Sequence, residues 1–197
     1  MNLLKPRPLS CGDLIEIIAT SGPVEFEPVM AAKSYFEKKG YRVKLAEHLF
    51  DVERYLAGDD ASRVEDLHNA FLDENVKAIV CARGGYGAIR LIKLIDFELI
   101  KNPKIFCGYS DVTALSAMFL KHSGLITYSS PMAVSDFASE LPNLLTEESF
   151  FNVLSGQRDF YMSEDTYLPG RAEGITFGGN LATLVSLCGI DFIPDEG

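Results

Sequence analysis

The sequence predicts an α/β domain built on a mostly parallel sheet with helices on both of its faces. Short runs of apolar and β-branched residues alternate with stretches of helical periodicity, which is the pattern of βαβ units. The runs are almost continuously apolar, as in AIVCA at 78–82, and this is typical of strands that are covered on both sides.

The elements can be placed in order from local signals. The helical stretch 29–39 ends at Gly40, a residue type common just after a helix C-terminus. Further on, Val64, Leu67 and Phe71 recur at i, i+3 and i+7, which puts one apolar stripe on the sheet. We expect a Rossmann-like domain of the flavodoxin-like kind. The five expected strands are 14–20, 41–46, 77–82, 104–108 and 125–129.

The pattern weakens after Pro131, which suggests a division of the chain. The expected parts are an N-terminal α/β domain at 1–133, a connector at 134–171 and the beginning of an incomplete C-terminal lobe at 172–197. In the last part, Leu181, Leu184 and Leu187 fall on one side of a helix. We expect the rest of that lobe to cover this side. Left uncovered, it would favour self-association, up to a homodimer.

Composition excludes some classes of function. The net charge is −10 and the basic residues are scattered, so a nucleic-acid partner is not expected. No apolar stretch approaches the roughly 20 residues needed to cross a bilayer, and the first 20 residues do not resemble a secretory signal peptide. The four cysteines show no CxxC spacing, so neither a disulfide framework nor a metal site is expected. The expected compartment is the cytoplasm.

The segment KIFCGYSDVTAL places Ser110 between a strand and a helix. In parallel α/β sheets, ligands bind beyond the carboxyl ends of the strands, and a serine on a sharp strand-to-helix turn is the nucleophile-elbow arrangement. Only half of the G-x-S-x-G pattern is present, because Asp111 and Val112 follow the serine. The alternative is that Ser110 is only a helix N-cap.

A glycine-rich segment, CARGGYGAIR, follows the expected strand at 77–82. Gly84, Gly85 and Gly87 would let the backbone approach a ligand closely or take a positive φ. A dinucleotide site is disfavoured because Arg90 stands where a glycine or alanine is needed, and no GK[ST] phosphate loop follows. The alternative is a plain turn.

Together, RGGYG at 83–87 and GYSD at 108–111 resemble the LD-carboxypeptidase family of serine peptidases. This family includes muramoyltetrapeptide carboxypeptidases and microcin C self-immunity proteins. Further matches are NPK at 102–104, TAL at 113–115 and GGNL at 178–181, so that the resemblance runs from Arg7 to Gly197.

The resemblance implies a role for each matching position. Ser110 would be the nucleophile, and the backbone N–H groups of Asp111 and Gly85 would bind the oxyanion. The implied reaction releases the terminal D-alanine of a cytoplasmic murein tetrapeptide by cleaving an L,D-peptide bond, with no cofactor and no metal.

The serine also needs a base, which in this family is a histidine oriented by a glutamate. The resemblance places both in a C-terminal lobe downstream of GGNL. The three histidines of this chain, His48, His68 and His122, are expected to be surface or capping residues. We therefore expect residues 1–197 to be the N-terminal portion of a longer protein and to be inactive alone.

Two classes of function remain open at this stage. One is a serine LD-carboxypeptidase, acting either in wall recycling or in immunity to a peptide antibiotic of the microcin C type. The other is a catalytically inert α/β domain that at most binds a ligand near Ser110. An unrelated esterase would not explain the RGGYG segment.

Overall fold

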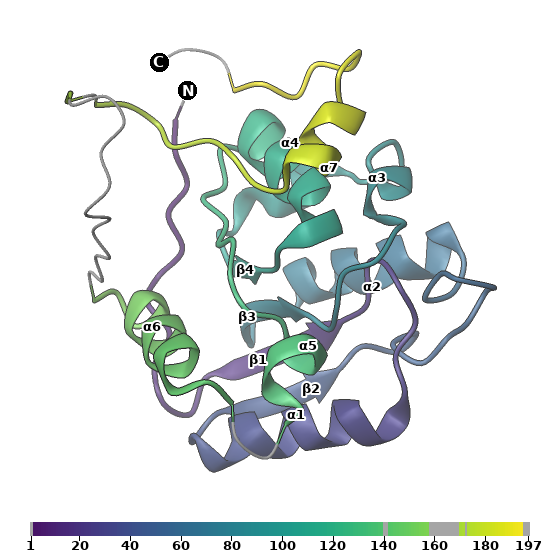
Figure 1. Ribbon diagram of the computed structural model, residues 1–197, viewed down its shortest axis with the longest axis vertical. Coiled ribbons are helices and arrows are strands. Elements are labelled where there is room, and N and C mark those ends of the chain that lie inside the picture. The colour runs from purple at the N-terminus through teal and green to yellow at the C-terminus, as the bar shows by residue number, and fades with distance from the viewer. Residues whose placement is uncertain (1, 140–141, 158–169, 172, 195–197) are drawn as a thin grey trace.

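The computed structural model describes residues 2–139, 142–157, 170–171 and 173–194, and its strands and helices alternate as predicted (Figure 1). The strands are β1 (Leu14–Ile18), β2 (Arg42–Leu45), β3 (Val76–Cys81) and β4 (Ile105–Cys107). The α-helices are α1 (Phe26–Lys38), α2 (Asp60–Leu72), α3 (Ala88–Leu91), α4 (Thr113–Ser123), α5 (Ala133–Phe137), α6 (Leu144–Leu154) and α7 (Leu181–Ser186). Two 3-10 helices are η1 (Phe97–Lys101) and η2 (Ser110–Val112).

The strands form one parallel sheet in the order β2-β1-β3-β4. This is the flavodoxin-like order up to its fourth strand. β1 and β3 pair through Ile17 and Val80, and both side chains are fully buried. β2 is an edge strand and is only half-buried, as its alternating sequence RVKL suggests. The predicted parallel α/β fold is confirmed.

The prediction of a fifth strand at 125–129 is wrong. This segment runs beside β4 but makes only an isolated bridge between Cys107 and Tyr128. Its start bridges instead to Leu4, from the N-terminal segment, through Leu125. Because its two ends pair with different partners, no continuous ladder forms.

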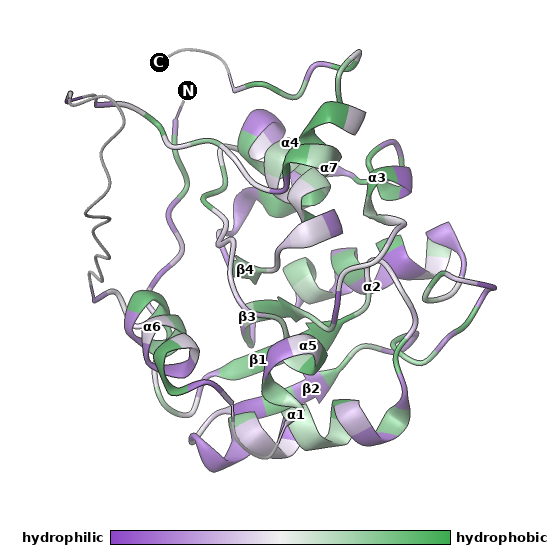
Figure 2. Ribbon diagram, viewed as in Figure 1, coloured by the Kyte–Doolittle hydropathy of each residue, from purple (hydrophilic) through white to green (hydrophobic). Residues whose placement is uncertain are grey.

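Helices cover both faces of the sheet, and each face has its own aromatic cluster. Phe36 of α1 packs against Phe137 of α5 and Phe150 of α6, with ring centroids 5.2 and 6.1 Å away. The other cluster joins three phenylalanines from α2, β4 and α4, with centroids 4.9 to 6.3 Å apart: Phe71, Phe106 and Phe119. In Figure 2, β1 and β3 are mainly hydrophobic, whereas hydrophobic and hydrophilic residues alternate along α1 and α2.

The predicted stripe of Val64, Leu67 and Phe71 lies on the buried side of α2, as expected. The end of α1 is also as predicted, because Gly40 follows it with a φ of 90°. Its beginning is at Phe26, three residues earlier than the apolar periodicity indicated.

The segment predicted to be a connector contributes two helices, α5 and α6, to the domain. Phe137, Phe150 and Leu154 from these helices are almost fully buried in the main core. The predicted division of the chain at 133 and 171 stays a prediction. Most of the stretch just before 171 lies outside the described residues.

The prediction that Leu181, Leu184 and Leu187 form one exposed apolar side of the last helix is wrong for Leu184 and Leu187. Leu187 is only 1% exposed and Leu184 is half-buried, because these two residues face the domain where α7 packs beside α4 (Figure 1). Leu181 and Val185 are the exposed apolar residues of α7, at 76% and 60%. Among the described helices, none has the length and hydropathy to span a membrane.

Candidate active site

Three turns meet at the carboxyl edge of the sheet. They follow β1 at Ser21-Gly22, β3 at residues 83–87 and β4 at Tyr109-Ser110. The N–H of Gly22 donates to the carbonyl of Gly84 at 3.3 Å, which joins the first turn to the second. In an open parallel sheet, this edge is where ligands bind, near the point where the strand order reverses. In this sheet that point lies between β1 and β3.

Ser110 has a left-handed backbone conformation, with φ of 61°. A non-glycine residue in this region costs of order 1 kcal/mol or more, and such strain concentrates at functional sites. The turn is also tight, because a Cβ at Gly108 would lie 2.7 Å from Cγ1 of Val112. This is the geometry of a nucleophile elbow, in which a sharp turn exposes the serine.

The alternative reading of Ser110 as a helix N-cap is wrong. The N-cap of η2 is Tyr109 and that of α4 is Val112, and neither helix start has a side-chain capping hydrogen bond. The strained backbone of Ser110 is therefore not compensated by a cap of either helix.

Each glycine of the 83–87 turn is required by a different structural constraint. A Cβ at Gly84 would lie 3.2 Å from Oγ of Ser110, so this turn and the serine are in close approach. Gly85 has φ of 133° and lies against the backbone of Gly22. Gly87 has φ of 136°, and a Cβ there would lie 2.6 Å from Nη1 of the buried Arg63. A plain turn would explain the positive φ values but not the contact with Ser110.

A depression of about 350 Å³ opens over these turns. Its lining residues are Arg83, Gly84, Gly85, Tyr109, Ser110, Met132, Val134 and Ser135. The structure thus brings Ser110 and Gly85 to one surface, as is required if the serine and the N–H of Gly85 are to act on the same carbonyl group. Burial, with the Asp136 carboxylate nearby, raises the pKa of Tyr109 above its ordinary value.

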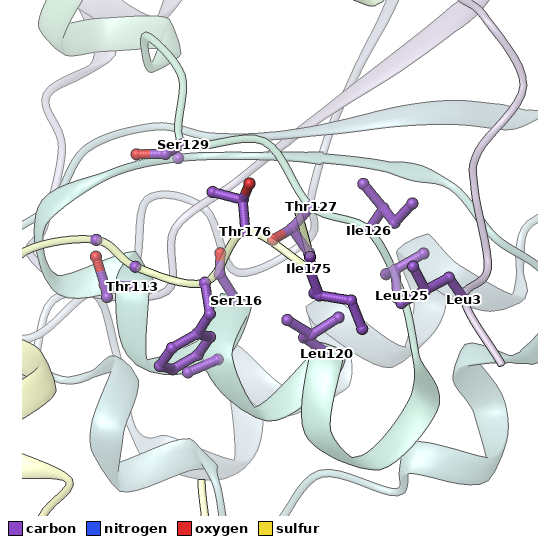
Figure 3. A pocket seen from close by; sticks show the side chains of 16 residues that line it. Leu3, Thr113, Ser116, Leu120, Leu125, Ile126, Thr127, Ser129, Ile175 and Thr176 are labelled. Carbon is purple, nitrogen blue, oxygen red and sulfur yellow. The ribbon is translucent and has the colours of Figure 1, made fainter. Parts of the chain in front are cut away.

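A larger cavity of about 670 Å³ lies at the far side of β4 and α4 (Figure 3). Hydroxyls of Thr113 and Ser116 lie toward one end of it, and Leu120 and Leu125 lie toward the other. Ser110 does not line this cavity, so we place the candidate active site in the smaller depression.

The three histidines are engaged elsewhere, and none of them lines the depression. Nδ1 of His48 lies 2.9 Å from the Asp66 carboxylate, which raises the pKa of His48. Nε2 of His68 accepts the backbone N–H of Asp96 at 3.0 Å, and burial lowers the pKa of His68. The ring of His122 packs against Phe97, 4.5 Å between centroids.

The described residues contain no group of three or more His, Cys, Asp or Glu side chains that could hold a metal ion. Cys81 and Cys107 lie in the strands, and burial raises the pKa of each thiol to about 12. They pack as small apolar side chains, whereas Cys11 and Cys188 are exposed.

One functional feature was not found from the sequence. The side chain of Asp111 is 7% exposed and points beneath the site, where Oδ2 accepts from Oγ of Ser21 at 2.7 Å. It also accepts the backbone N–H of Ala88 at 2.8 Å. The family resemblance implies only a backbone role for Asp111. The available signal is that Asp111 is the charged residue of the strand-to-helix junction at 105–113.

Comparison with known proteins identifies the family. Residues 15–130 match the family described as the LD-carboxypeptidase N-terminal domain, which is more than half of the chain. The chain belongs to the LD-carboxypeptidase family. The resemblance drawn from RGGYG and GYSD is confirmed.

Three LD-carboxypeptidase relatives illustrate the match. The chain is 39% identical over 196 residues to a probable murein peptide carboxypeptidase of Bacillus subtilis (strain 168), covering 97% of this chain and 61% of the relative. It is 27% identical to the microcin C7 self-immunity protein MccF of Escherichia coli, covering 98% of this chain and 66% of that one. The crystal structure of an MccF-like protein from Bacillus anthracis str. Ames superposes with a TM-score of 0.87 at 34% identity, covering 98% and 67%.

The chain therefore spans about three fifths of the length of the first of these LD-carboxypeptidase relatives. The roles assigned to Ser110, Asp111 and Gly85 stay predictions.

Proposed function

We propose that the protein carrying this chain is a serine LD-carboxypeptidase that releases D-alanine from a murein tetrapeptide in the cytoplasm. The observation that supports this most directly is the close approach of the Gly84-Gly85 backbone to the strained Ser110 within one depression. A nucleophile and backbone donors must flank one carbonyl for acyl transfer. The 39% identity to a probable murein peptide carboxypeptidase supports the choice of substrate.

The proposed reaction has two steps. Oγ of Ser110 attacks the carbonyl carbon of the L-residue, and its proton passes to a base. The N–H groups of Asp111 and Gly85 stabilise the oxyanion, after which the C–N bond breaks and D-alanine leaves with a proton. Water then attacks the ester, releases the tripeptide and restores the serine.

The proposal assigns the base and its orienting glutamate to residues outside 1–197. This is supported by the histidine contacts described above, since His48, His68 and His122 are each held away from the depression. An unassisted serine hydroxyl is a weak nucleophile at pH 7. Residues 1–197 alone should therefore show no meaningful turnover.

Arg83 is a further proposed contributor. A carboxypeptidase must hold the terminal carboxylate of its substrate, and Arg83 is the cationic residue among those that line the depression. Guanidinium groups bind carboxylates through paired hydrogen bonds. The Arg83→Met variant should raise KM much more than it lowers kcat, and amidation of the terminal carboxyl group should weaken binding to wild type only.

The test uses the protein as its gene encodes it and follows free D-alanine from an L,D-tetrapeptide. Ser110→Ala should abolish release, whereas Ser155→Ala, at an exposed serine that ends α6, should retain it. D-alanine release by Ser110→Ala at the wild-type rate would contradict the proposal.

The same assay, together with a second assay that follows cleavage of an aminoacyl-sulfamoyl nucleotide, separates the alternatives. Absence of turnover in wild type would favour an inert α/β domain. Turnover of an aminoacyl-sulfamoyl nucleotide in place of the tetrapeptide would favour a microcin-type immunity peptidase.

A further inference from the structure

The carboxylate of Asp111 joins the three turns that make the candidate site. It belongs to the turn after β4, and Oδ2 accepts from Ser21, in the turn after β1, at 2.7 Å. The same oxygen accepts from the N–H of Ala88, just after the glycine turn that follows β3, at 2.8 Å. These turns are distant in sequence, so this one atom links three separate segments of the chain.

Arg63 packs against the same glycine turn at Gly87. Its side chain is 1% exposed, and Nη1 donates to the carbonyl of Thr20 at the end of β1, at 2.7 Å. The missing Cβ of Gly87 would lie 2.6 Å from that nitrogen. Arg63 also pairs with Asp60, which in turn pairs with Arg90 of α3 at 2.7 Å. Arg63 is thus packed against the turn at Gly87, and Asp60 links it to Arg90 just beyond the turn.

Such an arrangement has a cost that needs an explanation. Burying a carboxylate and a guanidinium is unfavourable unless both are paired and hydrogen-bonded. A hydrophobic residue at 111 would fill the space without that cost, but it would leave the N–H of Ala88 and the hydroxyl of Ser21 without their acceptor. What these two buried polar side chains provide, each through its own partners, is a fixed geometry between the turns.

We propose that Asp111, supported by Arg63, is a positioning residue that holds the Gly84-Gly85 backbone in register with Ser110. It does not touch the substrate, and its carboxylate acts through Ser21 and Ala88. This inference rests on the proposed function, because the geometry it maintains is that of the oxyanion site. It adds a side-chain role to a residue whose expected role was its backbone N–H.

The catalytic test compares three variants of the protein as its gene encodes it. Asp111→Ala removes the acceptor, and a displacement of about 1 Å at a reacting centre costs roughly 100-fold in rate. We expect kcat to fall by about that factor while KM changes little. Asp111→Asn keeps an oxygen acceptor at the same place, so its kcat should stay within about tenfold of wild type. Asn143→Ala is the matched control, since it removes a side-chain acceptor of a backbone N–H, that of Thr146, away from the site.

A second measurement separates positioning from the chemistry. Hydrogen exchange of the amides at 84–88 should be at least tenfold faster in Asp111→Ala than in Asn143→Ala, and near wild type in Asp111→Asn. The exchange measurement does not need an active enzyme. If wild type released no D-alanine, the proposed function would fail while exchange at 84–88 still decided whether Asp111 positions the turn.

Two results would overturn the inference. One is exchange at 84–88 that is equal in Asp111→Ala and Asn143→Ala. The other is a kcat of Asp111→Ala that stays within threefold of the control while wild type is active.

Discussion

A methyl group at Gly84 would lie 3.1 Å from Cβ and 3.2 Å from Oγ of Ser110. The two residues are separated by a strand, a short helix and a 3-10 helix in sequence, yet they approach each other closely across the carboxyl edge of the sheet. The carbonyl of Gly84 also accepts from Gly22 at 3.3 Å, so the turn cannot retreat freely from the serine. The absence of a side chain at 84 is therefore part of the site.

Gly84→Ala should damage activity much more than stability. The φ of Gly84 is not in the left-handed region, so the only obstacle to a methyl group is Ser110. Displacing Oγ by a fraction of an ångström up to 1 Å should cost roughly 10- to 100-fold in kcat, while overpacking should cost about 1 kcal/mol of unfolding free energy. Gly174→Ala is the control, because nothing lies within 4 Å of its added Cβ. Equal D-alanine release by the two variants would show that the contact does not matter.

Ser110→Gly should be more stable than Ser110→Ala, although neither should release D-alanine. Glycine takes a positive φ without the steric cost of a Cβ, which is about 1 kcal/mol. For a chain of this size, that difference corresponds to roughly 2–4 °C in melting temperature. Arg54 has a φ of 59° and lies outside the depression, so Arg54→Gly against Arg54→Ala is the matched pair. A lower melting temperature for Ser110→Gly than for Ser110→Ala would contradict the inference that the backbone of Ser110 is strained.

The sequence was sufficient to predict the elements whose stability depends on local contacts and the strands in the middle of the sheet. The apolar runs of β1 and β3 read as doubly covered strands, because both faces are buried. The segment 125–129 has similar composition, but whether it forms a ladder depends on a competing pairing with Leu4, which local pattern cannot show. The packing of α5 and α6 was missed for the same reason, since Phe137 and Phe150 find their partner in α1.

The site was predictable only to the level of its motifs. Ser110 and the glycine turn could be placed at strand ends, and parallel strands bring such ends to one edge. The shared hydrogen bonds of Asp111 could not be predicted, because Ser21 is 90 residues away from it in sequence. Arg63 lies in sequence beside the apolar stripe of α2 and carries no local signal of burial, which only the structure shows.

Replacing the three histidines should leave catalysis almost unchanged. The variants His48→Gln, His68→Gln and His122→Gln should each keep kcat for D-alanine release within about threefold of wild type, because none of these rings lines the depression. His48→Gln also loses an ion pair with Asp66, so its melting temperature should fall most at pH values where His48 is protonated. A 100-fold loss of kcat in any single variant would identify that histidine as the base and contradict its assignment outside 1–197.

Lys104 should make stability rise with pH in the alkaline range. Its side chain is 3% exposed, and Nζ donates to the carbonyls of Ala70 and Asp73 at the end of α2. Burial lowers the pKa of Lys104 from 10.5 to about 8. Between these values the unfolded chain binds more protons than the folded one, so the unfolding free energy increases as pH rises.

The expected gain from Lys104 is about 2 kcal/mol between pH 7 and pH 10, at roughly 1.4 kcal/mol for each unit of pKa difference. Half-buried phenols such as Tyr35 and Tyr128, whose pKa values are raised by desolvation, act in the opposite direction above pH 10. The measurement is therefore the difference between wild type and Lys104→Met in urea unfolding across this range, with Lys93→Met, at an exposed lysine, as the control. A wild-type curve parallel to that of Lys104→Met would mean that the ammonium of Lys104 is not destabilised by its burial, and that its two carbonyl partners compensate for the lost hydration in full.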